Sequence, residues 1–348
     1  NQTDNDDLYK IYWEDTKMEF SATAGTAGGS LKALFEVRDG DNLENFKGKV
    51  TKADSYSLTV ENISIDNIKS LNLPDKDGKI TVNNISYSYD SWEAQVDAQG
   101  NIKSVTFNLS KDKAIADPEK TVAEGYLLNA GSAINARGIP YYMTQLNEFV
   151  RNFSEMFNQI ESKGQNLNGD TPPTFFEAIT NTAKVYDFSE SEAYSKLPDG
   201  QTATINSSSN TYYRMTAANF SVNKDVMNDV SLFATSTDYV KTDSCDIVDE
   251  LKKLQSEKTV YRGDKAESFL ETIISNVSVD TEKAETYNKL YSNLEQTIAN
   301  QRTSVSGVDE DEEALNLVKF QYSYNMASKI ISVMNQMLDK LINDTGVA

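Results

Sequence analysis

The C-terminal part of the chain carries an unbroken heptad seam of apolar side chains. Its members are spaced alternately three and four residues apart, the repeat that keeps one stripe of an α-helix facing a partner helix. The seam consists of Leu317, Phe320, Tyr324, Ala327, Ile331, Met334, Leu338 and Leu341. The sequence therefore predicts a long terminal helix that needs other helices to cover this seam.

A second apolar line runs along an adjacent face of the same predicted helix. It comprises Met326, Ile330, Val333 and Met337. One partner helix does not cover two faces, and uncovered apolar faces are costly in water. The pattern favours many copies packed around one another, and we predict that the heptad seam is an assembly interface.

Two composition features exclude several enzyme classes. No histidine occurs in the 348 residues, so mechanisms that use imidazole as a base or metal ligand are excluded. Cys245 is the single cysteine, which leaves no internal disulfide and no two-cysteine metal site. We interpret Cys245 as a small, partly buried residue at the start of a helix over residues 246–254. No catalytic residue, cofactor or metal ion is predicted, and we expect the protein not to be an enzyme.

The charge balance limits the classes of partner. The chain has 33 basic and 53 acidic side chains, a net charge of −20, which repels nucleic acid and anionic membrane surfaces. The sequence contains no apolar run of about eighteen residues and no charged-then-apolar leader. We therefore expect neither nucleic acid nor membrane as a partner, and neither a membrane span nor a signal peptide.

The hydrophobic period changes along the chain and predicts an α+β multidomain protein with long helices and β-rich outer domains. The predicted segments are residues 1–40 for the end of a β-rich region and the start of a helical rod, 41–136 for an inserted β-rich outer domain, 137–184 for a rod segment, 185–262 for a second β-rich domain, 263–306 for a further rod segment and 307–348 for the C-terminal assembly helix.

Local signals refine these segments. Strands are expected over residues 9–13 and 17–21, and a helix over 30–37. Pro140 lies in the first turn of a second predicted helix, where its missing N–H costs nothing. A third predicted helix reaches about Arg302, with a break or kink at residues 278–280.

Three polar or aromatic clusters have a functional interpretation and a structural one. The carboxylates of residues 309–313 could bind a cation, but anions at a helix start already complement the helix dipole. Asp75 and Asp77 resemble the start of a calcium loop that lacks its later ligands, so a hairpin turn is favoured. Tyr87, Tyr89 and Trp92 offer flat faces to sugars, yet aromatic residues on one face of a strand more often pack together.

Four separated blocks of residues carry a family pattern. The first runs from Gly28 to Gly40, with a Gly-Gly-x-Leu start and Arg38-Asp39 near its end. The second comprises Ile139-Pro140-Tyr141, Leu146-Asn147, Phe153, Phe157-Asn158, Gly164, Leu167-Asn168-Gly169 and Phe175-Phe176; the third, residues 217–223 and 234–236; the fourth, residues 302–313, Leu315, Leu317, Phe320-Gln321, Tyr324 and Ala327. In these blocks the chain resembles the flagellar hook-associated protein 1 family.

The chain departs from this family in two places. Residues 41–136 separate two blocks that are close in the family, so the resemblance gives the insert no role. The asparagine-rich N-terminal helix of the family is absent, so we expect the chain to be the C-terminal portion of a longer protein.

The resemblance implies a structural adaptor at the joint between the bacterial flagellar hook and filament. It implies an extracellular location after type III export, and self-assembly into a ring through terminal helices. The implied partners are further copies of the protein, the hook protein, hook-associated protein 3 and an export chaperone that binds the C-terminal helix. The alternatives are a secreted carbohydrate-binding or adhesive module and an enzyme grafted into residues 41–136, which the absence of histidine disfavours.

Overall fold

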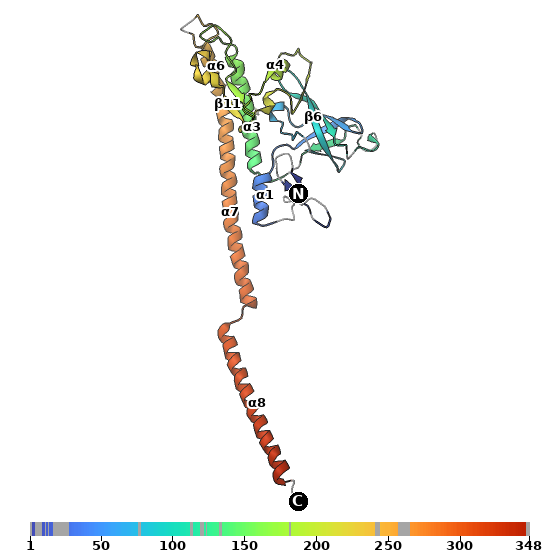
Figure 1. The fold of residues 1–348 in the computed structure, drawn as a ribbon, viewed down its shortest axis with the longest axis vertical. Helices are drawn as coiled ribbons and strands as arrows, with labels where there is room; N and C mark the ends of the chain where they lie inside the picture. The colour runs from blue at the N-terminus through green and yellow to red at the C-terminus, as the bar shows by residue number, and fades with distance from the viewer. Residues whose placement is uncertain are drawn as a thin grey trace. The chain divides into compact units, whose positions relative to one another are not determined.

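The structure is a computed structural model that describes residues 28–75, 78–111, 114–118, 122, 124–131, 134–180, 182–240, 244–256 and 265–345, together with residues 2, 3, 9, 10, 12 and 14–16. It divides into two compact units, Asn1–Ile274 and Ser275–Ala348. Helices and strands both contribute, as the predicted α+β class requires (Figure 1).

The N-terminal elements agree with the sequence in part. Strand β1 (Gln2–Thr3) pairs antiparallel with β2 (Tyr9–Lys10), whereas the expected partner strand at residues 17–21 lies outside the described residues. Helix α1 (Ser30–Asp39) confirms the predicted helix. It ends at Gly40, whose backbone is extended.

Residues 46–130 form a closed antiparallel barrel of six strands. The strands are β3 (Phe46–Ala53), β4 (Ser57–Glu61), β5 (Gly78–Val82), β6 (Ile85–Val96), β7 (Ile102–Leu109) and β8 (Leu127–Ala130). The pairings β3–β4, β4–β7, β7–β6, β6–β5, β5–β8 and β8–β3 close the ring. A turn at residues 99–101 joins β6 to β7, where Gly100 has a φ of 77° that favours glycine.

The barrel interior is filled by alternate residues of each strand, as the period of two predicts. Its largest fully buried side chains are Trp92, Tyr89, Phe46, Phe107, Leu58, Ile80 and Leu128. The rings of Tyr89 and Phe107 lie 5.0 Å apart between centroids. The alternating pattern thus places a large aromatic core inside the segment that the sequence marks as an insert.

The segment after residue 185 also contributes to this core. Strand β10 (Ala203–Asn206) pairs antiparallel with β6. Ile205, Tyr194 and Tyr213 are buried in the same cluster as the barrel side chains, and the Tyr213 ring packs edge-on to Trp92 at 5.3 Å. The segments 41–136 and 185–262 therefore share a core, and the autonomy of each as a domain stays a prediction.

Helix α3 (Ile139–Glu161) lies beside the barrel and contacts α1 and α6 (Figure 1). The apolar stripe of α3 packs on the start of α7 (Ala266–Ser306), where Phe149 stacks on Phe269 at 6.4 Å. The remaining described elements are η1 (Ile68–Ser70), β9 (Phe176–Ala178), α4 (Ser189–Ser195), η2 (Tyr212–Arg214), β11 (Phe220–Val222), α5 (Lys224–Asn228), η3 (Val230–Leu232) and α6 (Asp246–Ser256).

Two sequence predictions about the C-terminal half are wrong in detail. Helix α7 continues through residues 278–280 without the predicted break, because one aspartate in an exposed helix costs only a fraction of a kcal/mol, roughly 0.7 at most. Cys245 is exposed rather than partly buried. Helix α8 (Glu310–Thr345) forms where the heptad seam predicts it. Among the described residues, no helix combines the length and apolar character needed to cross a membrane.

Candidate functional site

The start of α8 is capped by an acidic side chain. The Oδ1 atom of Asp309 accepts hydrogen bonds from the backbone N–H groups of Asp311 at 2.9 Å and Glu312 at 3.4 Å. These N–H groups have no partner within the helix, so the cap stabilises the first turn. Four further carboxylates, at residues 310–313, follow in that turn and complement the helix dipole.

The predicted assembly seam of α8 is exposed along its whole length. Its large side chains are between 51% and 74% exposed, and Ala327 is exposed as well. The second apolar line is equally open to solvent, from Met326 to Met337. No described residue of α8 is buried. The structure thus shows two apolar stripes on one helix, and their use as an interface stays a prediction.

The apolar side chains of α7 divide into a buried group and an exposed group. Phe269 and Ile273 are buried against the apolar stripe of α3. Farther along, Tyr287, Tyr291 and Leu294 are about half exposed or more. Helix α7 therefore begins in a packed core and continues with the same uncovered apolar line that characterises α8.

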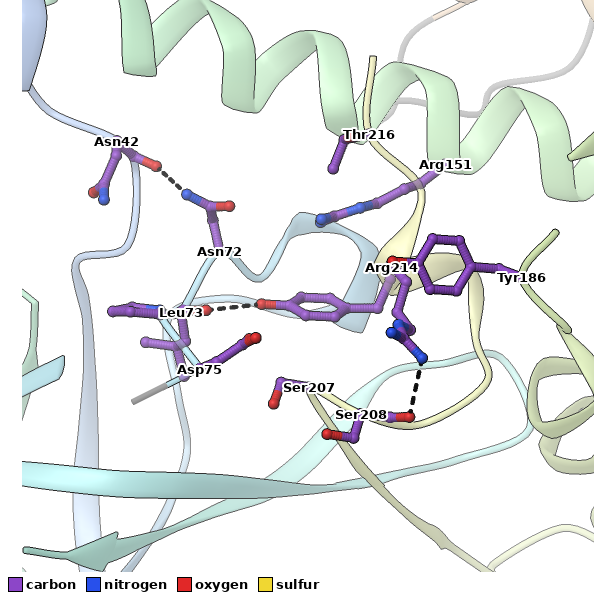
Figure 2. Close-up of a pocket in the computed structure, with 12 residues that line it drawn as sticks. Asn42, Asn72, Leu73, Asp75, Arg151, Tyr186, Ser207, Ser208, Arg214 and Thr216 are labelled. Atoms are coloured by element: carbon purple, nitrogen blue, oxygen red, sulfur yellow. Dashed lines mark hydrogen bonds between the residues drawn. The ribbon is translucent and has the colours of Figure 1, made fainter. Parts of the chain in front are cut away.

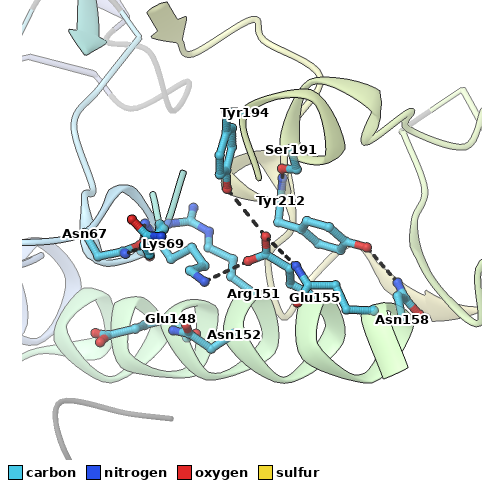
Figure 3. Close-up of polar contacts among 12 residues, drawn as sticks. Asn67, Lys69, Glu148, Arg151, Asn152, Glu155, Asn158, Ser191, Tyr194 and Tyr212 are labelled. Atoms are coloured by element: carbon cyan, nitrogen blue, oxygen red, sulfur yellow. Dashed lines mark hydrogen bonds and ion pairs between the residues drawn. The ribbon is translucent and has the colours of Figure 1, made fainter. Parts of the chain in front are cut away.

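A buried polar cluster joins α3 to the barrel, and the sequence analysis did not predict it. Arg151 is 4% exposed and donates from Nε to the carbonyl of Met215 at 2.9 Å. Its Nη1 donates at 3.1 Å to the carbonyls of Lys69 and of Leu71, at the end of η1. The guanidinium also lies 4.5 Å from the centre of the Tyr213 ring. We name this set of contacts the polar clasp (Figure 3).

An ion pair and a hydrogen bond extend the polar clasp along α3. The Nζ of Lys69 lies 2.7 Å from Oε2 of Glu155, whose side chain is only 5% exposed. The Ser70 hydroxyl donates to Oε1 of Glu148 at 3.0 Å. Glu148, Arg151 and Glu155 follow one another at helical spacing, so one face of α3 carries all three, and Figure 3 shows this face turned toward η1. Charged residues on one face of a helix are ordinarily exposed to solvent. In this protein the charged face of α3 packs against η1 instead.

Burial changes the acidity of groups in and near the polar clasp. Loss of water lowers the pKa of Arg151, while the neighbouring Tyr213 and Glu148 favour its charged form. Burial, reinforced by Asp75, raises the pKa of Tyr213 to about 12, although Arg151 opposes the shift. These shifts describe a structural interface, because each group already has partners within the protein.

Other candidate site residues are placed in structural roles. Tyr87, Tyr89 and Trp92 are buried in the barrel, so they present no platform to a sugar and the packing interpretation is confirmed. In the described part of the chain, no three acidic or cysteine side chains converge in a way that would hold a metal ion. Asp77, in the turn that resembles a calcium loop, lies outside the described residues.

Two comparisons with known proteins agree with the resemblance. Residues 299–344, which include most of α8, match the family described as "Flagellar basal body rod FlgEFG protein C-terminal". The chain is also 21% identical over 341 residues to flagellar hook-associated protein 1 of Bacillus subtilis (strain 168). That alignment covers 96% of this chain and 56% of the relative, so the chain spans little more than half the length of the protein it matches.

Both comparisons are with proteins of the bacterial flagellum. The family match falls on the helix that carries the heptad seam, and the longer alignment extends the likeness over nearly the whole chain. The chain is therefore a protein similar to flagellar hook-associated protein 1, as its four sequence blocks predict.

Proposed function

We propose that the protein is an adaptor at the junction between the flagellar hook and filament, and that it assembles into a ring through α8. The observation that carries this proposal is the continuous, exposed heptad seam, with a second apolar line beside it. Burying such stripes between subunits removes the cost of leaving them in water. The match of residues 299–344 to a flagellar rod family supports the same role for this helix.

The proposed partners follow from this role. Further copies of the protein cover the seam within the ring, while the hook protein and hook-associated protein 3 lie on either side of it. An export chaperone covers the exposed stripes of α8 before assembly, and the assembled protein is extracellular. The acidic surface, with a net charge of −20, favours permanent exposure to solvent and disfavours nucleic acid as a partner.

The test replaces Ile331 and Leu338 together with aspartate. Two charges buried between subunits cost several kcal/mol, so self-association should weaken at least about 100-fold. Analytical ultracentrifugation over a range of protein concentrations measures the association. In cells that carry the same double change, motility should be lost and filament subunits should leak into the medium.

A matched control adds the same two charges on the polar face of α8, at Asn325 and Gln336. Because these positions point away from both apolar lines, association and motility should stay normal. Normal filaments in cells with the seam variant would contradict the proposed role of α8.

A further inference from the structure

A polar cavity lies beside the polar clasp, between the barrel, α3 and the segment around η2. Its volume is about 570 Å³, within the range of cavities that hold small ligands. Figure 2 shows Arg151 entering from α3, Arg214 and Tyr186 at one side, and Asn72 and Asp75 at the other. The cavity draws on five separate stretches of the chain, at residues 42, 72–75, 151, 186 and 207–216, all within the first compact unit.

Two arginines give the cavity its charge. Arg151 is held in place by three backbone carbonyls, and among the described residues its Nη2 donates to no protein group. Arg214 stacks on the Tyr186 ring at 4.1 Å and makes one long hydrogen bond, 3.4 Å from Nη1 to the Ser208 carbonyl. Both guanidinium groups therefore keep N–H donors available on the cavity side.

Among the lining residues that the structure describes, the opposing charge comes from Asp75 alone, so these residues carry a net charge of +1 in a protein of net charge −20. A singly charged anion matches this balance better than a phosphate monoester, which carries close to two charges. The guanidinium fork fits the geometry of a carboxylate. The preferred charged group is accordingly a carboxylate.

The neutral lining has the chemistry that hydroxyl groups need. Ser207 and Ser208 supply donors and acceptors, and the carboxylate of Asp75 accepts from hydroxyls. The amide N–H groups of Asn72 already donate to Asn42 and Thr144, so Asn72 offers its side-chain oxygen as an acceptor. Tyr213 borders the cavity, but its own hydroxyl donates to the Leu73 carbonyl at 3.0 Å and so stays fixed. The walls expose more polar than apolar surface, which suits a ligand that carries hydroxyl groups as well as apolar ring faces.

We propose that this cavity binds a saccharide that carries a carboxylate, such as a uronic acid unit. The carboxylate is held between Arg151 and Arg214, and the ring hydroxyls bond to the amide, serine and Asp75 groups. This site is independent of the assembly seam on α8 and of the aromatic residues in the barrel core. It would give the protein a recognition surface for acidic glycans in addition to its structural role.

The test titrates the whole chain with cellobiouronic acid and, separately, with cellobiose, which lacks the carboxylate. Isothermal titration calorimetry should show saturable binding of the uronic acid, at least about tenfold tighter than that of cellobiose, because a charge-assisted contact is lost with the neutral sugar. The binding should weaken as sodium chloride is added. Equal binding of the two sugars, or no saturable binding of either, would overturn the proposal.

Three variants locate the site. Arg214→Gln should weaken binding of cellobiouronic acid at least about tenfold. Asp75→Asn should strengthen it about threefold, because the asparagine oxygen still accepts from a ring hydroxyl while the repulsion between the two carboxylates is removed. Arg137→Gln is the matched control, since Arg137 is an exposed arginine that stacks on Tyr141 outside the cavity. Unchanged binding in the Arg214 and Asp75 variants would overturn the assignment to this cavity.

Discussion

Glu161 ends helix α3 inside the protein, where it is 2% exposed. Its Oε1 accepts a hydrogen bond from the backbone N–H of Ala234 at 2.6 Å, while its Oε2 has no partner among the described residues. Burial raises the pKa of this carboxyl from 4.5 to about 7, against the opposing effect of the Ala234 hydrogen bond. The folded protein therefore holds a proton that the unfolded chain releases at lower pH.

Because Glu161 binds this proton in the folded state, we predict that the stability of the protein depends on pH. Between pH 4.5 and about 7 the folded state binds more protons at Glu161 than the unfolded state, so the free energy of unfolding should fall as the pH rises through this window, by up to about 3 kcal/mol. Glu161→Gln keeps the acceptor for Ala234 and should remove this fall. Urea unfolding at pH 4.5 and pH 8 measures it.

The control for this prediction is Glu285→Gln, on the exposed surface of α7. It should leave the difference between the two pH values as it is in the unchanged protein. An equal pH dependence in the Glu161 and Glu285 variants would show that another group is responsible.

A second prediction concerns the contribution of Arg151 to stability. Arg151→Met removes the donors to the carbonyls of Met215, Lys69 and Leu71, so unfolding should become easier by about 3–5 kcal/mol. Arg151→Lys keeps the charge without the fork and should be intermediate. Thermal unfolding followed by circular dichroism measures the loss.

The comparison variant is Arg137→Met, because Arg137 is an exposed arginine whose guanidinium stacks on the Tyr141 ring. It should change stability by no more than about 0.5 kcal/mol. A similar effect of both substitutions would mean that the polar clasp adds little to stability.

At the scale of elements, α8 is a long helix whose described side chains are not buried by tertiary contacts. It has 36 residues and no buried side chain among those described. Helices without tertiary contacts are marginal in water, and their amides exchange readily. We expect the amides of α8 to exchange quickly in dilute protein and to become protected as the concentration rises and copies associate. Hydrogen exchange followed by mass spectrometry at several concentrations measures this.

The amides of β6 and β7 provide an internal reference, because these barrel strands pair with each other and with further strands. Their protection should be high at every concentration. If α8 were strongly protected even in the most dilute sample, it would have a cover within its own chain, and the argument from the seam would be mistaken.

Helices and strands whose apolar residues recur at a regular spacing could be predicted from the sequence, whereas the interfaces between these elements could not. Helix α8 and the barrel strands follow from spacings of 3.5 and of two residues, which repeat over many positions. The polar clasp was missed because Glu148, Arg151 and Glu155 form the pattern of a solvated helix face. Only the tertiary arrangement brings the carbonyls of η1 and of Met215 to this face. The polar cavity was missed for the same reason, since its walls come from distant segments.

At the scale of the whole molecule, the barrel supplies a test of the predicted domain boundaries. All six strands of the closed ring lie within residues 41–136. We therefore expect this segment, expressed alone, to unfold cooperatively in urea. Its stability should be lower than that of a version that includes residues 185–216, because Tyr194, Ile205 and Tyr213 cover part of its core.

The complementary experiment removes residues 41–136 and joins Gly40 to Gly138. The two ends are adjacent, since the Asp41 N–H donates to the Ala136 carbonyl at 2.8 Å. A Cβ atom added to Gly40 would lie only 2.6 Å from the backbone nitrogen of Gly138, which shows how closely the two chain segments approach one another. Circular dichroism of the deletion should retain the helices, and their loss would mean that the barrel is integral to the helical core.

The crossing at Gly40 and Gly138 has a mechanical consequence. A domain attached to the rest of a protein at a single point can rotate freely about that point. Here the polar clasp fixes a second point on η1, and the pairing of β10 with β6 fixes a third. The barrel is thus held at more than one point, so a torque applied to it passes into α3 through the contacts with η1 as well as through the chain ends.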